Sequence, residues 1–418
     1  MTKINRKIQI HEDWLVVLIA SAIIIFFING FISPVPVFNW NNLADFQSKI
    51  CSVENLQKIF YQFLWVAISG VIAAYLSGKK VLPFLLQFTF IWLISITAII
   101  IAGNKQIKAV NLEAVIFSLS IGLIIGNVFR LPQWFRQLLS AEVFVKIGLV
   151  LLGTSIIFSD ILKAGLYGIV QSLVVVISVW YFSFWVCRKL KIDKELALML
   201  SSAVSICGVS AAIATSGAIK GDNKKLSYVI SLVLIVAIPM MIGMPYISKL
   251  IGLSQAETGA WLGGSIDTSG AVVAAGTLVG EEALKISTIV KFSQNVLLGI
   301  AAFLISVYWT YTKKSEIEGV EEKPTLQVIW NRFPKFVLGF IAASVIFSFV
   351  LDPQIITGVK DNLKSIQTLW FVLAFTSIGL ETNFSDLFTA QNRKPLYAFL
   401  VAQLFNVIIT LIMAVILF

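Results

Sequence analysis

Two stretches rich in glycine and hydroxyl side chains interrupt runs of sequence that are otherwise apolar. The first reads Ser-Ser-Ala-Val-Ser-Ile-Cys-Gly-Val-Ser from residue 201, and the second reads Gly-Gly-Ser-Ile-Asp-Thr-Ser-Gly from residue 263. In hydrocarbon every backbone N–H and C=O needs a partner, so irregular backbone persists only against protein or a wet cavity. Transporters use half-helix ends of this kind to hold ions at the bilayer midplane. The two stretches therefore predict a binding site within a membrane.

The small and polar residues of these stretches are candidates for substrate binding. Backbone N–H groups at the positive ends of half-helices favour an oxyanion. Close helix packing by small residues is the competing interpretation, and for each residue taken alone it is the more common one. The candidates for substrate binding are Ser205, Cys207, Gly208, Ser210, Gly264, Ser265, Thr268, Ser269, Gly270 and Asn295.

Two charged residues, Asp267 and Lys291, are the candidates for ion coupling. A charge inside a span costs about 2.5–3.5 kcal/mol and usually marks function. The Asp267 carboxylate would coordinate Na⁺ or carry a proton; the structural alternatives are an ion pair or an N-cap for the half-helix that follows. Lys291 would pair with Asp267 or attract an anion, unless its long stem carries the ammonium to the membrane interface.

The composition indicates a polytopic helical membrane protein. Of 418 residues, 58% are hydrophobic and 13% are charged, whereas soluble domains carry about 25% charged residues. The net charge of +10 comes from residues scattered through short loops, so a nucleic-acid partner is not expected. Three cysteines lack metal-ligand spacing. We expect no cofactor or metal other than a coupling Na⁺ or H⁺.

Apolar runs of spanning length predict an all-α fold with about thirteen transmembrane helices. The loops that are cytoplasmic when the N-terminus is cytoplasmic carry more Lys and Arg than the opposite loops, which favours that orientation. The expected spans are 14–33, 59–77, 81–102, 112–128, 144–159, 164–187, 195–219, 225–250, 257–280, 283–311, 334–351, 366–382 and 395–417.

Three consecutive segments are expected along the chain. Residues 1–110 would form N-terminal, scaffold or peripheral spans. Residues 111–251 would form a first half that contains the broken helix 195–219, and residues 252–418 a second half that contains the broken helix 257–280.

A short motif that occurs twice in the chain suggests an inverted repeat. Thr-Ser-Ile, followed by Phe-Ser-Asp, occurs from Thr154 and again from Thr376, on helices expected to run in opposite directions. The two interrupted helices present a conflict, because the expected spans place them in the same direction. Inverted halves need opposed elements, so the mate of the first broken helix stays open.

Six motifs lie between residues 110 and 418: Lys146-Ile-Gly-Leu-Val-Leu-Leu-Gly, Ser205-Ile-Cys-Gly, Val272-Val-Ala-Ala-Gly, Glu281-Glu-Ala, Val290-Lys-Phe and Ile378-Gly-Leu-Glu-Thr-Asn. Together they resemble the motifs of the YeiH-type sulfate exporter family. The resemblance implies a multi-pass protein of the bacterial inner membrane. More distantly, the chain is similar to the sodium/proton antiporter and bile-acid transporter superfamily, which implies inverted repeats, a scaffold domain, a core domain with two broken helices, and a homodimer.

The chain departs from this family at one position. Where relatives commonly have His, the sequence Ser265-Ile-Asp-Thr has Asp267, and the single histidine of the chain is His11, near the N-terminus. The departure leaves the coupling ion open between H⁺ and Na⁺, and it also leaves the substrate open.

The favoured function is a secondary active transporter of small anions, working by alternating access and coupled to H⁺ or Na⁺. The substrate would be a sulfate- or sulfite-like oxyanion or a small carboxylate. The alternative is a cation/proton antiporter that uses Asp267. An intramembrane enzyme is a remote third, because Cys207 has no histidine base nearby in the sequence. The chain is therefore not expected to be an enzyme.

Overall fold

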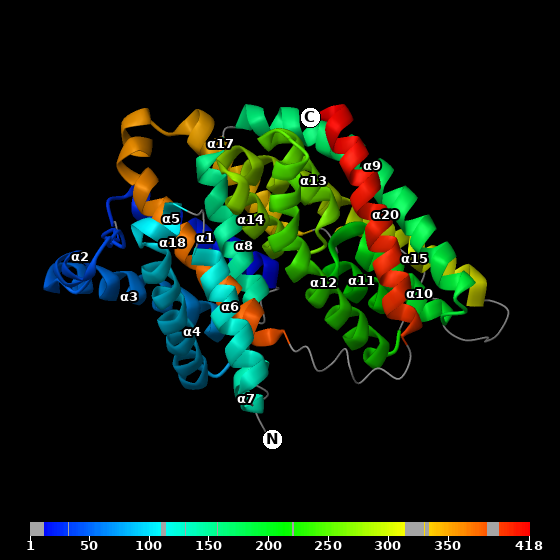
Figure 1. Ribbon diagram of the computed structural model, residues 1–418, viewed down its shortest axis with the longest axis horizontal. Coiled ribbons are helices and arrows are strands. Elements are labelled where there is room, and N and C mark those ends of the chain that lie inside the picture. The colour runs from blue at the N-terminus through cyan, green and yellow to red at the C-terminus, as the bar shows by residue number, and fades with distance from the viewer. Residues whose placement is uncertain are drawn as a thin grey trace, which may run out of the picture. The chain divides into compact units, whose positions relative to one another are not determined.

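The computed structural model describes residues 12–31, 33–109, 114–129, 131–156, 158–219, 221–313, 330, 334–382 and 393–418 (Figure 1). His11 lies outside these residues. The regular elements in the described part are helices, which confirms the all-α class. Eight of these helices are long and apolar enough to cross a membrane, and four shorter apolar helices accompany them.

The chain divides into two compact units that are interleaved along the sequence. Unit 1 comprises residues 1–158 and 335–383, and unit 2 comprises residues 159–334 and 384–418. Each unit combines two separate stretches of the sequence, whereas the sequence suggested consecutive segments. Both interrupted stretches belong to unit 2.

Unit 1 is a helical assembly in which glycine permits close packing. A Cβ on Gly122 would lie 2.6 Å from the Thr376 carbonyl oxygen, so two backbones approach as small residues allow in membrane proteins. Its elements are α1 (Glu12–Ile28), α2 (Leu43–Asp45), η1 (Phe46–Ile50), α3 (Val53–Leu76), α4 (Val81–Ala102), α5 (Lys105–Ala109), α6 (Ala114–Val128), α7 (Gln133–Leu138), α8 (Ala141–Leu152), η2 (Gly153–Ser155), α17 (Lys335–Val345), η4 (Ile346–Val350) and α18 (Pro353–Glu381).

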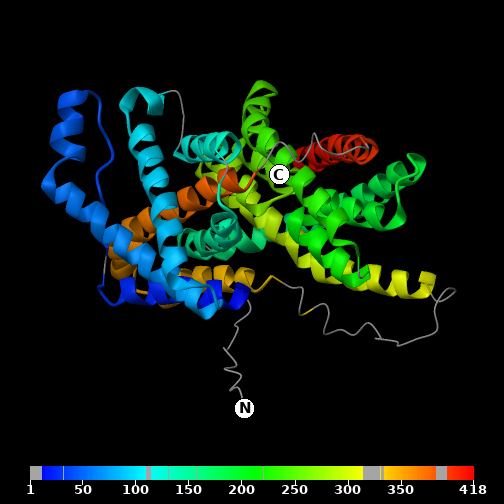
Figure 2. The same ribbon diagram turned by 90° about the horizontal axis from the view of Figure 1, so that it is seen from below.

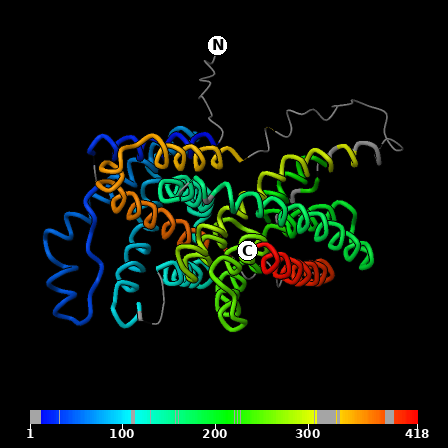
Figure 3. The backbone as a smooth tube through the Cα atoms, turned by 90° about the horizontal axis from the view of Figure 1, so that it is seen from above, coloured from blue at the N-terminus to red at the C-terminus, as the bar shows by residue number. Residues whose placement is uncertain are grey.

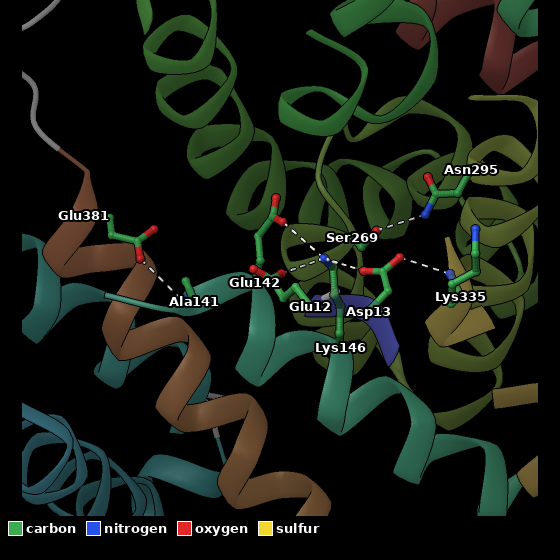
Figure 4. A network of polar contacts seen from close by, with 9 residues as sticks. All are labelled: Glu12, Asp13, Ala141, Glu142, Lys146, Ser269, Asn295, Lys335 and Glu381. Atoms are coloured by element: carbon green, nitrogen blue, oxygen red, sulfur yellow. Dashed lines mark hydrogen bonds and ion pairs between the residues drawn. The ribbon is translucent and has the colours of Figure 1, made fainter. Parts of the chain in front are cut away.

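A charged network ties three helices of unit 1 together (Figure 4). The Lys146 ammonium on α8 lies 2.9 Å from Glu12 and 3.0 Å from Asp13, both in the first turn of α1. The other carboxylate oxygen of Asp13 accepts a hydrogen bond from the backbone N–H of Lys335, the first residue of α17. The network joins the starts of α1 and α17 to α8, which is a structural role.

In the described part of the chain, unit 2 contains four long helices and four half-length ones. Its elements are α9 (Phe158–Lys189), α10 (Lys194–Ser202), η3 (Ala203–Cys207), α11 (Val209–Ile219), α12 (Asn223–Leu250), α13 (Gln255–Ser265), α14 (Ser269–Val279), α15 (Glu281–Lys313) and α20 (Lys394–Leu417). The interruptions expected at 195–219 and 257–280 are therefore present, between η3 and α11 and between α13 and α14.

The first interrupted element is a hairpin, because its two halves are antiparallel. Glu195, in the first turn of α10, accepts a hydrogen bond from the backbone N–H of Asp222, which follows the end of α11. The Lys225 ammonium also lies 2.5 Å from the Glu195 carboxylate. Both ends of the element thus lie together, and the chain turns back at Gly208. We call residues 194–219 hairpin 1.

The second interrupted element folds back in the same way. A Cβ on Gly280, just after α14, would lie 2.5 Å from the side-chain oxygen of Gln255, the first residue of α13. Along α15, Gly259 of α13 packs on Ala283 and Gly264 accepts a hydrogen bond from Gln294, so α13 is parallel to α15. We call residues 255–279 hairpin 2.

For α14 the order of contacts along α15 is reversed. Ser269, at its start, binds Asn295, whereas Gly276 packs on Leu284, so α14 is antiparallel to α15. The two halves of hairpin 2 therefore run in opposite directions and meet at a turn over residues 266–268.

The two hairpins enter unit 2 from opposite ends, because α12 alone connects them. That helix has 28 residues and extends about 42 Å, which is enough to cross a bilayer. In Figure 1, α13 lies toward the top of unit 2, and α10 and α11 lie lower. The halves α11, α13 and α14 each have eleven residues. Each extends about 16 Å, roughly half of a hydrocarbon core of about 30 Å.

The expectation that residues 195–219 and 257–280 each cross the membrane once is therefore wrong. The apolar run has the length of a span, but a turn at its centre returns the chain to its starting side. The conflict over the directions of the two elements disappears, since opposed hairpins need one span between them. The fold-back also moves Lys225 to the side of Arg188 and Lys189, which strengthens the charge asymmetry of the loops.

Single-cysteine labelling tests this arrangement in a background where Cys51, Cys187 and Cys207 are replaced. We expect Lys191→Cys and Lys225→Cys to react with a membrane-impermeant maleimide from the same side, because hairpin 1 joins them. Ile251→Cys, at the far end of α12, should react from the opposite side. Labelling of Lys191→Cys and Lys225→Cys from opposite sides would show that residues 194–219 cross the membrane.

Candidate functional site

The tips of the two hairpins are in contact at Gly208 and Asp267. A Cβ on Gly208 would lie 3.1 Å from the Asp267 Cβ and 3.2 Å from the Asp267 carbonyl oxygen. Gly208 has φ +60°, a backbone conformation that favours glycine. The sequence Cys-Gly at this tip therefore provides both the sharp turn and the space that Asp267 occupies.

Side chains of α15 satisfy carbonyl groups at the C-terminal ends of the first half of each hairpin. The Lys291 ammonium donates to the Ile206 carbonyl at 2.8 Å in hairpin 1 and to the Gln294 side chain at 3.0 Å. The Gln294 amide in turn donates to the Gly264 carbonyl in hairpin 2. A cation at a helix C-terminus also opposes the negative end of the helix dipole. Lys291 and Gln294 thus link the two tips.

Side chains of α20 also donate hydrogen bonds to carbonyl groups at the tips, from a different direction than those of α15. Gln403 donates to the Ser265 carbonyl at 2.7 Å. Asn406 bridges the hairpins, because its amide lies 3.1 Å from the Val204 carbonyl and 3.3 Å from the Ser265 carbonyl. In Figures 2 and 3 the green helices of hairpin 1 lie between α15 in yellow and α20 in red. The tips are therefore held from two sides by uncharged amides and one ammonium.

The N-terminal ends of α11 and α14 face the same region with a different chemistry. Thr268 caps α14, since its hydroxyl accepts from the backbone N–H of Ala271, and Ser269 accepts from the Asn295 amide (Figure 4). The expected structural role of Asp267 as the N-cap is thus filled by Thr268. First-turn N–H groups have no acceptor within their own helix, so α11 and α14 both present positive ends at the tips.

Buried oxygens without a donor gather around hairpin 2. Among the described residues, Asp267 Oδ2, Ser265 Oγ, Asn295 Oδ1 and Gln403 Oε1 are buried and have no hydrogen-bond partner. Each such group costs about 1–3 kcal/mol when it stays unsatisfied. Folded proteins rarely tolerate several together, so we expect water or a bound species to complete the hydrogen bonding of these oxygens.

The structure separates the sequence candidates by role. Gly208, Ser265, Asp267, Lys291 and Asn295 come together at the tips, and Thr268 and Ser269 shape the start of α14. Ser205 is fully buried and donates back to the Ser201 carbonyl, which leaves its hydroxyl oxygen as an acceptor only. Gly264 packs against Gln171 and Thr410. Cys207 and Gly270 are buried, and Ser210 is half-buried on α11.

The Lys291 ammonium lies inside unit 2. The alternative interpretation, in which its long stem carries the ammonium to the membrane interface, is therefore wrong. The side chain is 2% exposed and is committed to Ile206 and Gln294. The described contacts of Lys291 and Asp267 include no direct ion pair between the two side chains. The ammonium donates to the Ile206 carbonyl of hairpin 1 instead.

Gln403 and Asn406 are site residues that sequence reasoning missed. They lie with Thr410 at positions i, i+3 and i+7 of α20, so they share one face of a helix whose other residues are mostly apolar. Thr410 donates to the Asn406 side chain at 3.0 Å, which holds the amide toward the hairpins. The sequence signal that could have identified them is the polar stripe that Gln403, Asn406 and Thr410 form on the last apolar helix.

The base of hairpin 1 is closed by an ionic cluster at its polar end. Lys225 lies 2.6 Å from Asp193 and 2.5 Å from Glu195. Partial burial alone would raise the pKa of Asp193, but the hydrogen bond and charge of Lys225, together with hydrogen bonds from the backbone of Leu196 and Glu195, outweigh it and hold that pKa below the ordinary value. Burial likewise opposes the charged form of Lys225, and the two carboxylates nevertheless raise its pKa. Asp193 and Lys225 thus stay charged near neutral pH.

Comparison with known proteins gives the chain a family. A family model described as "Conserved hypothetical protein 698" matches residues 86–398. A UPF0324 membrane protein of Rhodopirellula baltica is 39% identical over 365 residues, covering 85% of this chain and 67% of that protein. The chain belongs to this family. Two UPF0324 membrane proteins of Nitratidesulfovibrio vulgaris are 39% and 38% identical over 354 residues, covering 82% of this chain and 60% of each relative.

Membership of the UPF0324 family agrees with a multi-pass membrane protein, as the apolar helices indicate. The chain spans about 60% of the length of the two Nitratidesulfovibrio relatives. No solved structure matches the chain. The relatives are named only as membrane proteins, so the function must be argued from the site.

Gly208→Ala tests the contact between the tips, with Gly252→Ala as the matched control. Both glycines have positive φ, but a Cβ on Gly252 would have no atom within 4 Å, whereas a Cβ on Gly208 would meet Val233 at 2.6 Å. We expect Gly252→Ala to lose about 1–2 kcal/mol of stability from backbone strain. Gly208→Ala should lose about 1–3 kcal/mol more from overpacking, measured by thermal unfolding in detergent. Equal losses would contradict the close packing of Gly208 against Val233 and Asp267.

Proposed function

We propose that this chain is a secondary active transporter of small anions whose site lies between the tips of hairpins 1 and 2. The observation that carries the proposal is the meeting of two hairpins, from opposite ends of unit 2, at Gly208 and Asp267. Backbone that leaves the helix at membrane depth is tolerated where it lines a cavity or is buried in protein. Substrate and ion sites of transporters occur at such discontinuities.

The charges and donors at the tips support an anion as substrate. The positive ends of α11 and α14 lie beside the buried ammonium of Lys291. Ser210, Thr268 and Ser269 add hydroxyl groups that are partly accessible. A sulfate- or sulfite-like oxyanion or a small carboxylate suits this set, because such groups accept several hydrogen bonds at once.

The opposed hairpins also support alternating access. Each tip is reached from a different end of unit 2, so loosening one hairpin opens the site to one side while the other stays closed. Such a movement would break and re-form the hydrogen bonds that Lys291, Gln294 and Asn406 donate to backbone carbonyls. The coupling ion, H⁺ or Na⁺, is assigned to Asp267.

A cation/proton antiporter is the second candidate, and one observation favours it. Asp267 Oδ2 is buried without a partner among the described residues, which suits a carboxylate that exchanges ions. Anion binding separates the two functions, because an antiporter of cations requires no anion at the tips.

A thermal-shift screen of the purified protein tests the anion proposal. Sulfate, sulfite and small carboxylates are added at constant ionic strength, and we expect at least one to raise the melting temperature, since a ligand at 100 times its Kd stabilises by about 2.7 kcal/mol. Lys291→Gln should abolish the response, and Lys249→Gln, on the exposed end of α12, should retain it. Proteoliposome uptake of the active anion then measures transport.

Two results would overturn the proposal. A melt that responds to Na⁺ or Li⁺ and to no anion would favour the cation antiporter. An anion response that is unchanged in Lys291→Gln would place the anion away from the hairpin tips.

A further inference from the structure

Three apolar helices of unit 2 have their ends around one cavity, away from the hairpin tips. α9 and α15 begin there and α20 ends there, and all three are long enough to cross a bilayer. The cavity therefore lies at the level where hydrocarbon meets water. Figure 1 shows the C-terminus beside the start of α9, and the rings of Tyr167 and Phe418 pack edge to face at 5.8 Å. The cavity volume is about 550 Å³, which is typical of ligand pockets.

The cavity opens because α9 and α15 diverge toward their starts. A Cβ on Gly168 would lie 2.9 Å from the Ser293 hydroxyl oxygen, so the two helices cross closely there. About one turn earlier, a Cβ on Gly165 would meet its nearest atom, in Ile289, at 3.9 Å. The order of these contacts makes α9 and α15 parallel, and the space between them widens toward their first turns.

Charged side chains of both signs line the cavity at this end. Lys163 comes from α9, and Glu281, Glu282 and Lys285 come from the first five residues of α15. Among the described residues, Lys163, Glu282 and Lys285 have no ion-pair partner. The helix dipole favours the two glutamates in the first turn of α15 but gives no advantage to a lysine near a helix start. The lysines and Glu282 are therefore available to a ligand.

The rest of the lining is apolar or aromatic, and an apolar surface continues from it along α9. Ile169, Val170 and Leu173 follow the cavity on α9 and are exposed. A tyrosine at the end of a span is typical of the membrane interface. The arrangement suits an amphiphile, with a charged headgroup in the cavity and chains beside α9. The uncharged lining residues are Ala164, Tyr167, Ile286, Ile289, Leu417 and Phe418.

We propose that this cavity binds the headgroup of a zwitterionic phospholipid that carries a primary amine, such as phosphatidylethanolamine. Its phosphate accepts hydrogen bonds from Lys163 and Lys285, and its ammonium donates to Glu282. An anionic headgroup would leave the glutamates without a partner. A choline headgroup carries the same charges but has no N–H to donate to a carboxylate. The site does not depend on the identity of the transported substrate.

Thermal unfolding of the full chain in mixed micelles tests the site. One detergent is mixed with equal mole fractions of phosphatidylethanolamine, phosphatidylcholine or phosphatidylglycerol that have identical acyl chains. The affinity tag is placed at the N-terminus, because Phe418 lines the cavity. We expect phosphatidylethanolamine to raise the melting temperature most, with an apparent Kd at least several-fold below those of the other two lipids. Soluble phosphoethanolamine, which lacks chains, should give no comparable shift.

Substitutions in the cavity should change the headgroup preference. Lys285→Gln should raise the apparent Kd for phosphatidylethanolamine at least several-fold. Glu282→Lys should reverse the preference toward phosphatidylglycerol, because it replaces the partner of the ammonium with a second partner for the phosphate. Lys249→Gln is the matched control, since Lys249 is an exposed lysine at the end of α12 that precedes hairpin 2 and lies outside the cavity. It should leave the preference unchanged.

Four results would overturn the proposal. Equal stabilisation by the three lipids would show only solvation of apolar surface. A larger effect of phosphatidylglycerol on the wild type would exclude a zwitterion, and an equal shift from phosphoethanolamine would assign the cavity to a free headgroup. A preference that is unchanged in both Lys285→Gln and Glu282→Lys would place the lipid elsewhere. The first three results need only the wild type, so a variant that fails to fold leaves the test decisive. The anion response that Lys291→Gln removes is measured separately, so either proposal can fail alone.

Discussion

Backbone groups that leave a helix inside hydrocarbon need partners, and this requirement organises unit 2. Each hairpin ends its first half with carbonyls that no residue of the same helix can satisfy. Lys291 and Gln294 on α15, with Gln403 and Asn406 on α20, donate to those carbonyls. Without these long spans the tips would be unstable at this depth, so the hairpins and their supporting helices form one cooperative structure.

The distribution of donors and acceptors at the tips is uneven, and the unevenness has chemical consequences. Nearly all side-chain donors are committed to the backbone of the two tips, while oxygens of Ser265, Asp267 and Gln403 are left without partners among the described residues. The helix starts at α11 and α14 supply positive ends on the other side of the same contact. One small region can therefore hold charges of both signs, as the proposed coupled transport requires.

Much of this architecture is visible in the sequence. The all-α class and the location of both interruptions follow from hydropathy and from clusters of Gly, Ser and Thr, whereas the sequence left open whether Lys291 is buried. Reading the interruptions as crossings was wrong, because a half-helix hairpin and a broken span have the same length and composition. Gln403 and Asn406 escaped notice because isolated amides in a span are more often packing contacts.

The sequence by itself determined that polar, flexible backbone occurs at two points of an apolar chain, since the cost of such residues in hydrocarbon depends on residue type alone. Only the tertiary structure decided that both points are turns, that they meet, and which helices support them. Those facts depend on contacts between residues far apart in the chain, such as Gly208 with Asp267 and Asn406 with Val204. Local composition fixes where a helix is interrupted, and long-range packing fixes the direction in which the chain continues.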